Sequence, residues 1–207
     1  MKKLFSTLGM MAMISLCLFT SCKDEDVTAG PVNVQATINK AQVQQAQAQA
    51  TAQANTEAIA DAQAANPGAT VTQATDGTII TSNPDGSKVE TVVTTSYTYE
   101  VDGVAYNTIE EVQAALSKKR PGETAKVVAI LHTTTTSTPV AADGTKGTPK
   151  VNKEDKSSTT NITIPEAGEK SEQAIKVPVS TKTEQTADIN VSLATTTEGQ
   201  HSGGQIR

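Results

Sequence analysis

Apolar and polar residues alternate in several stretches of this chain, and a period of two predicts β-strands with one buried face. Residues 32–38 form the first such stretch. Three more candidates follow towards the other end of the chain, at 159–164, 173–180 and 186–195. Because Pro178 cannot donate a ladder hydrogen bond, we expect the strand that contains it to lie at the edge of a sheet.

Tight turns divide the middle of the chain into a β-meander. They are expected at 76–77, 83–86 and 102–103, where an aspartate precedes a glycine between two strand-like stretches. The Asp-Gly pair is a strong hairpin signal because glycine accepts the positive φ that a two-residue turn requires.

The third turn brings three tyrosines together. A two-residue loop at 102–103 places Tyr99 opposite Tyr106, and Tyr97 lies two residues away on the same face. They are the only aromatic residues after residue 21. Two interpretations stay open: the rings belong to the core of the domain, or they form an exposed patch that holds a ligand.

A short capped helix is expected directly after this hairpin, at 108–118. Thr108 can accept a hydrogen bond from the first turn, and Glu111 completes a capping box. The apolar face recurs at helical spacing and comprises Ile109, Val112 and Leu116.

Residues 40–65 are mostly alanine and glutamine, which are good helix formers. The larger apolar residues are only Val43 and Ile59, so no continuous stripe is available for docking. A weakly packed helix, a spacer and a low-complexity segment are all compatible with this composition. We favour the helix, ended by Asn66, Pro67 and Gly68.

The domain organisation follows from the remaining segments. Residues 127–131 are continuously apolar and predict a central strand, whereas 139–158 are rich in Pro, Gly, Lys, Asp and Ser and predict a loop or linker. We therefore expect an N-terminal β-rich unit at 32–138 and a C-terminal β unit at 159–199, either as two separate units or as one sandwich. A flexible tail is expected at 200–207. The expected fold class is mainly β (α+β), with antiparallel, sandwich-like sheets.

The first 21 residues have the features of a secretory signal. Lys2 and Lys3 precede an apolar run at 8–19, which is shorter than the roughly 20 residues that span a bilayer. The run ends at Phe19, Thr20, Ser21 and Cys22, and these residues resemble the lipobox of bacterial lipoproteins. The resemblance implies cleavage before Cys22, acylation of its thiol by palmitate-type chains, and a tether at 22–31.

The four residues after the cysteine are Lys23, Asp24, Glu25 and Asp26. They resemble the acidic export tag of Bacteroidetes surface lipoproteins; a solvated linker is the alternative. With the hairpin–helix motif at 97–116, the chain resembles a family of small lipoproteins from gut Bacteroidetes, some of which carry a label of pore-forming toxin. This resemblance implies a surface or periplasmic location and assigns no residue beyond Cys22.

Composition excludes several kinds of site. The net charge is −5 and becomes −7 when Lys2 and Lys3 leave with the signal, and an acidic chain is a poor nucleic-acid binder. Only Cys17 and Cys22 are present, so the mature chain forms no disulfide. With two histidines and no clustered ligands, we expect no metal, no cofactor and no enzyme activity.

We therefore expect a lipid-anchored outer-membrane protein that acts as a non-enzymatic structural or interaction module. It is expected to face the cell surface, with the periplasmic face as the alternative, and its partners would be envelope proteins or extracellular polysaccharide. One alternative is a membrane-acting protein that inserts β-hairpins, since 89–101 and 126–138 are long enough to span. The other is a glycan-binding surface lipoprotein that uses the tyrosines.

Overall fold

The computed structural model describes residues 32–197. Eleven elements follow one another in this part of the chain. They are β1 (Val32–Ile38), α1 (Lys40–Ala65), β2 (Thr70–Gln73), β3 (Ile79–Ser82), β4 (Lys88–Val101), β5 (Val104–Tyr106), α2 (Ile109–Leu116), β6 (Thr124–Val140), β7 (Lys150–Thr163), β8 (Lys170–Pro178) and β9 (Thr186–Thr197).

The strands form two antiparallel sheets. The larger sheet has the order β2-β3-β4-β6-β7, with β5 paired to β4, and the smaller has the order β1-β9-β8. The fold is mainly β, of the α+β class and sandwich-like, as the alternation predicted. β8 lies at an edge and β6 lies between β4 and β7, as the sequence also predicted.

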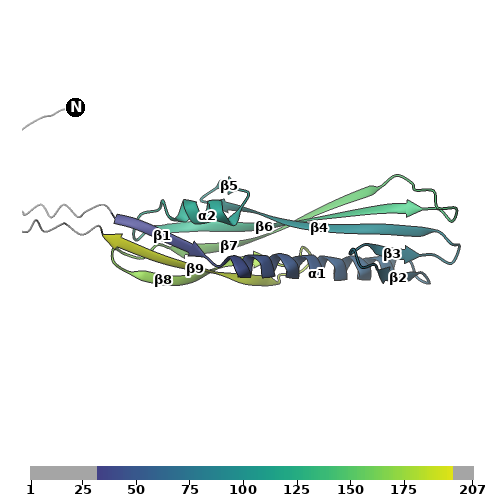
Figure 1. Cartoon of the computed structure of the whole chain (residues 1–207), viewed down its shortest axis with the longest axis horizontal. Coiled ribbons are helices and arrows are strands. Elements are labelled where there is room, and N and C mark those ends of the chain that lie inside the picture. The colour runs from purple at the N-terminus through teal and green to yellow at the C-terminus, as the bar shows by residue number, and fades with distance from the viewer. Residues whose placement is uncertain (1–31, 198–207) are drawn as a thin grey trace, which may run out of the picture.

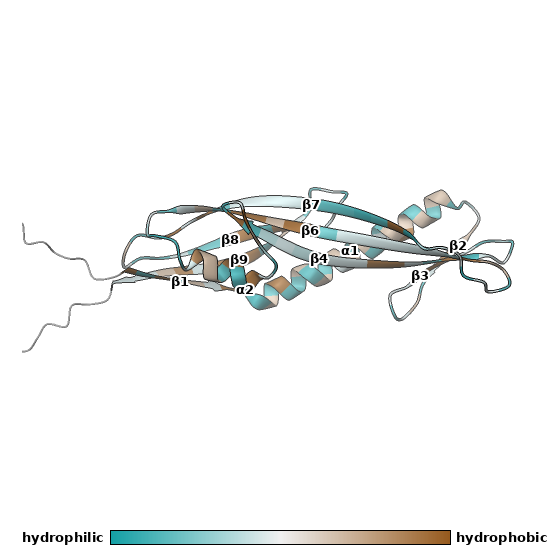
Figure 2. Cartoon of the chain, turned by 90° about the horizontal axis from the view of Figure 1, so that it is seen from above, coloured by the Kyte–Doolittle hydropathy of each residue, from teal (hydrophilic) through white to brown (hydrophobic). Residues whose placement is uncertain are grey.

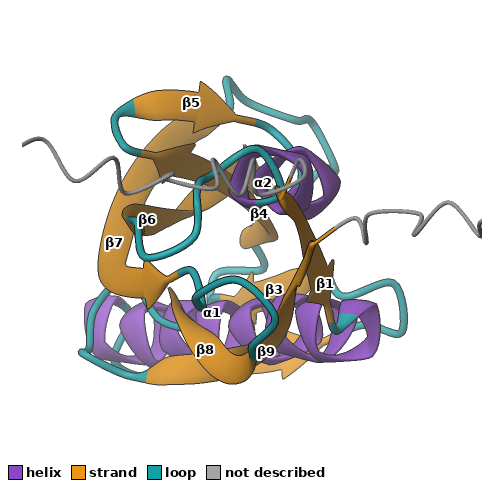
Figure 3. Ribbon diagram, turned by 90° about the vertical axis from the view of Figure 1, so that its left-hand side faces the viewer, coloured by secondary structure: helices purple, strands orange, loops and turns teal. Residues whose placement is uncertain are grey.

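The molecule is elongated because β4, β6 and β7 run along its length (Figure 1). At about 3.3 Å per residue, the 17 residues of β6 alone span about 55 Å. β1 begins and β9 ends at one end, which we call the proximal end; the β3–β4 and β6–β7 turns lie at the other, distal end (Figure 1). The smaller sheet covers the proximal half of the large sheet, and α1 covers the distal half (Figures 1 and 3).

The hydrophobic core lies between the two sheets in the proximal half. β6 contributes Ala125, Val127 and Ala129, while α2 closes one side of the sandwich between β1 and β4. The fully buried side chains of α1 are all small, namely Ala46, Ala50 and Ala54, and Val43 is partly buried against the main core. Figure 2 shows hydrophilic and neutral colours along most of this helix. The main core therefore lies in the proximal half, whereas the distal half buries few apolar side chains, among them Ile79 of β3.

Local predictions about the helices and the third hairpin are confirmed. Residues 40–65 form α1, whose N-cap Asn39 accepts hydrogen bonds from the Ala41 and Gln42 amides. α2 has the expected capping box between Thr108 and Glu111. The third hairpin has the expected register, since Val101 pairs with Val104 and Tyr99 with Tyr106.

The prediction of a loop or linker at 139–158 is correct only for 141–149, which connect two strands, and is wrong for the rest of the segment. β6 continues to Val140, and β7 begins at Lys150 and pairs with β6 over 14 residues. The first half of β7 is charged and polar because it is an edge strand exposed to solvent, and charged side chains are common on such edges. β1, from the predicted N-terminal unit, pairs with β9 and shares one hydrophobic cluster with it.

Side chains occupy the edges where the sandwich could otherwise be extended. On the outer edge of β1, the Ala36 amide donates to Ser117 Oγ at 3.1 Å and the Ile38 amide donates to Gln113 Oε1 at 3.2 Å. Between β7 and β8, the Lys176 amide donates to Thr160 Oγ1 at 2.9 Å. Backbone donors at these edges are thus satisfied without a further strand.

Candidate functional site

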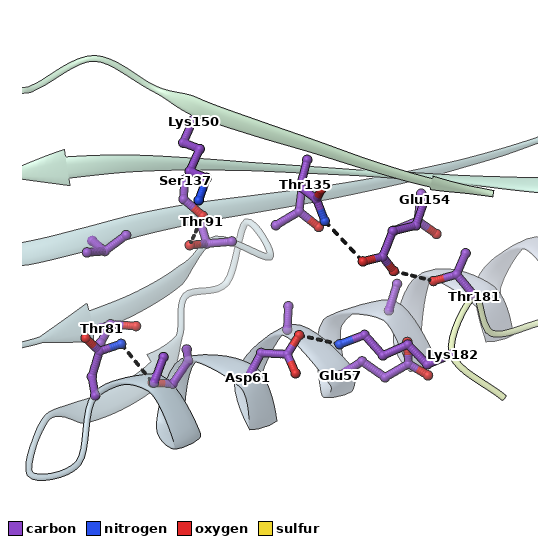
Figure 4. Close-up of a pocket in the computed structure, with 18 residues that line it drawn as sticks. Glu57, Asp61, Thr81, Thr91, Thr135, Ser137, Lys150, Glu154, Thr181 and Lys182 are labelled. Atoms are coloured by element: carbon purple, nitrogen blue, oxygen red, sulfur yellow. Dashed lines mark hydrogen bonds and ion pairs between the residues drawn. The ribbon is translucent and has the colours of Figure 1, made fainter.

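A cavity of about 380 Å³ lies under the distal half of α1, between the helix and the inner face of the large sheet (Figure 4). Helix residues form one wall, residues of β3, β4 and β6 form the floor, and β7 and the β8–β9 loop complete the rim. Pockets of roughly 300–1,000 Å³ are typical of small-ligand sites. The cavity is therefore large enough to hold a small molecule.

Hydroxyl groups form the floor of the cavity. They belong to Thr81, Thr91, Thr133, Thr135 and Ser137. Thr91 Oγ1 and Ser137 Oγ lie 3.0 Å apart and form a hydrogen bond between β4 and β6 (Figure 4). Thr133 is 7% exposed, and its Oγ1 is the one buried side-chain N or O atom in residues 32–197 without a hydrogen-bond partner.

Alanines form the opposite wall. Ala54, Ala58, Ala62 and Ala65 follow one another at helical spacing along α1 and line the cavity. Their methyl groups are too short to reach the hydroxyl floor and fill the space. The gap between helix and sheet is thus a direct result of small residues on one side and medium polar residues on the other.

Glu57 joins the helix wall to the β8–β9 loop. Its Oε1 accepts a hydrogen bond from Ser180 Oγ at 2.6 Å and another from Gln53 Nε2 at 3.0 Å. Ser180 Oγ in turn accepts hydrogen bonds from the Lys182 and Thr183 amides at 3.0 and 2.9 Å. The loop is therefore fixed against the proximal end of the cavity.

Charged groups surround the opening. Lys182 forms an ion pair with Asp61 (Figure 4), and this hydrogen-bonded carboxylate raises the pKa of the lysine. On the β7 side, Glu154 accepts hydrogen bonds from Thr181 Oγ1 at 3.0 Å and Asn152 Nδ2 at 3.1 Å. Lys150 also lines the rim and is exposed. A hydroxyl floor that is buried at Thr81, Thr91 and Thr133 and a charged, solvent-exposed rim thus face each other.

The site is suited to hydrogen bonding rather than to metal binding. Residues 32–197 contain no group of three or more His, Cys, Asp or Glu side chains that could hold a metal ion. The carboxylates at the rim already accept hydrogen bonds from protein donors. None of the lining residues is aromatic. The floor offers hydroxyls, which donate and accept, and the rim adds ammonium donors and carboxylate acceptors.

The tyrosines predicted as core or as a ligand patch lie elsewhere, on the proximal side. Tyr99 is 3% exposed, and Tyr97 and Tyr106 are partly buried against the main core. The rings of Tyr97 and Tyr99 stack with centroids 6.3 Å apart, and the Tyr97 hydroxyl donates to the Pro178 carbonyl at 2.5 Å. Burial raises the pKa of Tyr99 to about 12. These contacts account for the tyrosines as packing residues of the hydrophobic core.

An open groove of about 530 Å³ borders Tyr97 and Tyr99 between the N-terminal turns of α1 and α2. It also contains Gln47, whose Nε2 donates to the Thr95 carbonyl at 3.0 Å. Tyr106 does not line this groove. The predicted patch is therefore not a single surface of three rings, and ligand binding by Tyr97 and Tyr99 stays a prediction.

A row of hydrogen bonds crosses the opposite, outer face of the large sheet. Thr98 Oγ1 lies 2.7 Å from His132 Nε2, and His132 Nδ1 lies 2.7 Å from Asp155 Oδ1. Hydroxyl, imidazole and carboxylate occur in this order in hydrolase triads. However, β6 is paired on both edges at His132, so its amides are engaged in the ladders and cannot form an oxyanion hole. We interpret this row as a network that fixes the imidazole across three strands.

The predicted lipidation residue Cys22 and the predicted export-tag residues Lys23, Asp24, Glu25 and Asp26 lie outside the described residues. Sequence reasoning did not identify the hydroxyl floor. A signal was present: 133–138 are all Thr or Ser and directly continue an apolar central strand. Because side chains alternate across a strand, half of such a run must face inward.

Comparison with known proteins identified no matching family model, no matching curated protein and no matching solved structure. Within residues 32–197, neither helix combines the length and the apolar character needed to cross a bilayer.

Proposed function

We propose that this protein is a lipid-anchored, non-enzymatic interaction module that extends from the outer membrane. One observation carries the proposal: β1 and β9 place both ends of the described chain at the same end of an elongated body (Figure 1). Acyl chains on Cys22 would hold that end at the membrane, and several chains anchor a protein stably. The distal end would then point away from the bilayer.

The tether length is compatible with this orientation. Residues 22–31 can extend over at most about 35 Å, which is shorter than the body itself, since β6 alone spans about 55 Å. The β3–β4 and β6–β7 turns would be the parts most distant from the membrane. A partner in solution would meet these turns and the adjacent cavity first.

A non-enzymatic role is supported by the chemistry of the described residues. The carboxylates at the cavity rim are held by Ser180, Thr181 and Lys182, and the imidazole of His132 is held between a hydroxyl and a carboxylate on a flat sheet surface. The acidic run at 23–26 supports the cell surface over the periplasmic face. Envelope proteins and extracellular polysaccharide remain the proposed partners.

Single-cysteine labelling of intact cells tests the location and the orientation together. The chain has no cysteine after Cys22, so Ala142→Cys at the distal turn and Ala167→Cys at the proximal turn each introduce one thiol. Both alanines are exposed, which makes the variants a matched pair. A small membrane-impermeant maleimide should label both on intact cells, and a bulky polymer-linked maleimide should label Ala142→Cys faster.

Labelling only after the outer membrane is permeabilised would overturn the surface location. Equal rates with the bulky reagent would overturn the orientation. A variant with Lys23, Asp24, Glu25 and Asp26 all changed to Ala is expected to lose labelling on intact cells and to keep it after permeabilisation. Unchanged labelling of that variant would identify the acidic run as a plain linker.

A further inference from the structure

We infer that the cavity under α1 is a binding site for a neutral, polyhydroxylated molecule of monosaccharide or disaccharide size. The inference goes beyond the proposed function and does not depend on the membrane anchor, because it rests on the described residues of the cavity alone.

The inner face of β6 changes from aliphatic to hydroxylic along the strand. Its inward positions are aliphatic in the proximal half, from Ala125 to Leu131, and hydroxylic in the distal half, at Thr133, Thr135 and Ser137. Both halves belong to the same strand and face the same side of the sheet. A strand that only needed to pack against a helix would continue with aliphatic residues, since buried polar groups cost free energy unless they are hydrogen-bonded.

Thr133 is the second feature that indicates a ligand. Thr133 lines the cavity and is 7% exposed, and its Oγ1 is buried and has no partner among the described residues. An unpartnered buried hydroxyl is destabilising, and native structures normally satisfy such groups with protein, water or ligand. With a rotation of the Thr133 side chain about χ1 that turns its hydroxyl towards the cavity, a molecule there that offers hydroxyl groups would supply the missing hydrogen bond.

The helix wall opposite the floor is the third feature that indicates a ligand. Ala58 and Ala62 keep the space open where Leu or Met would fill it. Beyond Ala54, no residue of α1 is fully buried, and Glu57, Ala58, Ile59 and Ala62 are half-buried. Contacts at the rim, namely those of Glu57 with Ser180 and Asp61 with Lys182, hold this part of the helix against the β8–β9 loop beside the cavity.

The class of ligand follows from the groups that line the site. Three carboxylates and two ammonium groups lie at the rim, so its negative and positive charges nearly cancel. A strongly charged ligand of either sign would therefore find no excess of opposite charge at the site. Hydroxyl, amide and carboxylate groups pair readily with ligand hydroxyls. Because no aromatic ring lines the cavity, recognition would rely on hydrogen bonds rather than on stacking.

The test is an NMR titration of the full-length protein in a detergent without a sugar headgroup. The probes are glucose, galactose, maltose, cellobiose and lactose at millimolar concentration, with glycerol as the control for unspecific polyol effects. At least one saccharide should shift the amide signals of Thr133, Thr135 and Glu57 in a saturable way, and glycerol should not. The absence of saturable shifts with all five saccharides, or equal shifts with glycerol, would overturn the inference.

Two matched pairs of variants locate the site. Thr133→Val should weaken binding about fivefold through loss of one hydrogen bond, whereas Thr134→Val, on the outer face of the same strand, should bind normally. Ala58→Leu should abolish binding by filling the cavity, while Ala60→Leu, exposed on the same helix, should not. Binding that persists in Ala58→Leu, with a folded spectrum, would place the saccharide elsewhere and overturn the assignment.

Discussion

Asp102 combines a backbone role with an ion pair at the turn between β4 and β5. It is the one non-glycine residue with positive φ in residues 32–197, at 51°. Its carboxylate contacts Lys119 Nζ at 2.7 Å and accepts the Lys126 amide at 2.7 Å. The hydrogen bond from Lys119, followed by that from the Lys126 amide, lowers the pKa of Asp102.

Asp102→Asn should lower the free energy of unfolding by about 0.5–1 kcal/mol at neutral pH, as is usual for a partly exposed ion pair. Asparagine also tolerates positive φ, so the change isolates the charge. Because folding lowers the pKa, the contribution is present above the unfolded value near 3.8 and is lost as pH falls through the folded value. Urea unfolding from pH 7 to pH 2.5 should therefore show the two proteins converging in acid.

A control for this prediction is Asp143→Asn. The Asp143 carboxylate accepts only the Thr145 amide in the β6–β7 turn and forms no ion pair in the described part of the chain. We expect Asp143→Asn to change the free energy of unfolding less than Asp102→Asn does. A difference between wild type and Asp102→Asn that is equally large at neutral and acidic pH would exclude the ion pair as its cause.

At the scale of elements, α2 protects the open edge of β1. Ser117 and Gln113 accept the amide hydrogens of Ala36 and Ile38, which would otherwise be free to pair with another chain.

The double variant Gln113→Ala, Ser117→Ala should lose about 1–3 kcal/mol of unfolding free energy, since each hydrogen bond is worth about 0.5–1.5 kcal/mol. It should also self-associate in sedimentation experiments. Lys118→Ala, exposed on the same turn, should do neither.

At the scale of the whole molecule, the two halves should differ in local stability. The proximal half contains the main aliphatic core, and the distal half contains the hydroxyl-lined cavity. Segments with few buried apolar contacts open more easily. In hydrogen exchange, amides at 58–65 of α1 should therefore exchange faster than those at 46–54 of the same helix, and both should exchange faster than those at 125–131 of β6. Uniform protection along α1 would contradict this expectation.

Much of the local structure was determined by the sequence itself. The capping box at Thr108, the turn at 102–103 and the pairing of Tyr99 with Tyr106 could all be predicted, because each depends on residues a few positions apart. The alternation at 32–38 and 186–195 predicted strands for the same reason. The class of fold followed from these elements.

Only the tertiary structure decided which elements meet. β1 and β9 pair across more than 150 residues, and no local pattern encodes such a contact. β7 forms from a charged segment because its neighbour β6 offers a long free edge, so pairing overrides composition. The cavity arises in the same way: the alanines of 54–65 and the hydroxyls of 133–137 are unremarkable by themselves, and they form a site because the fold lays one over the other.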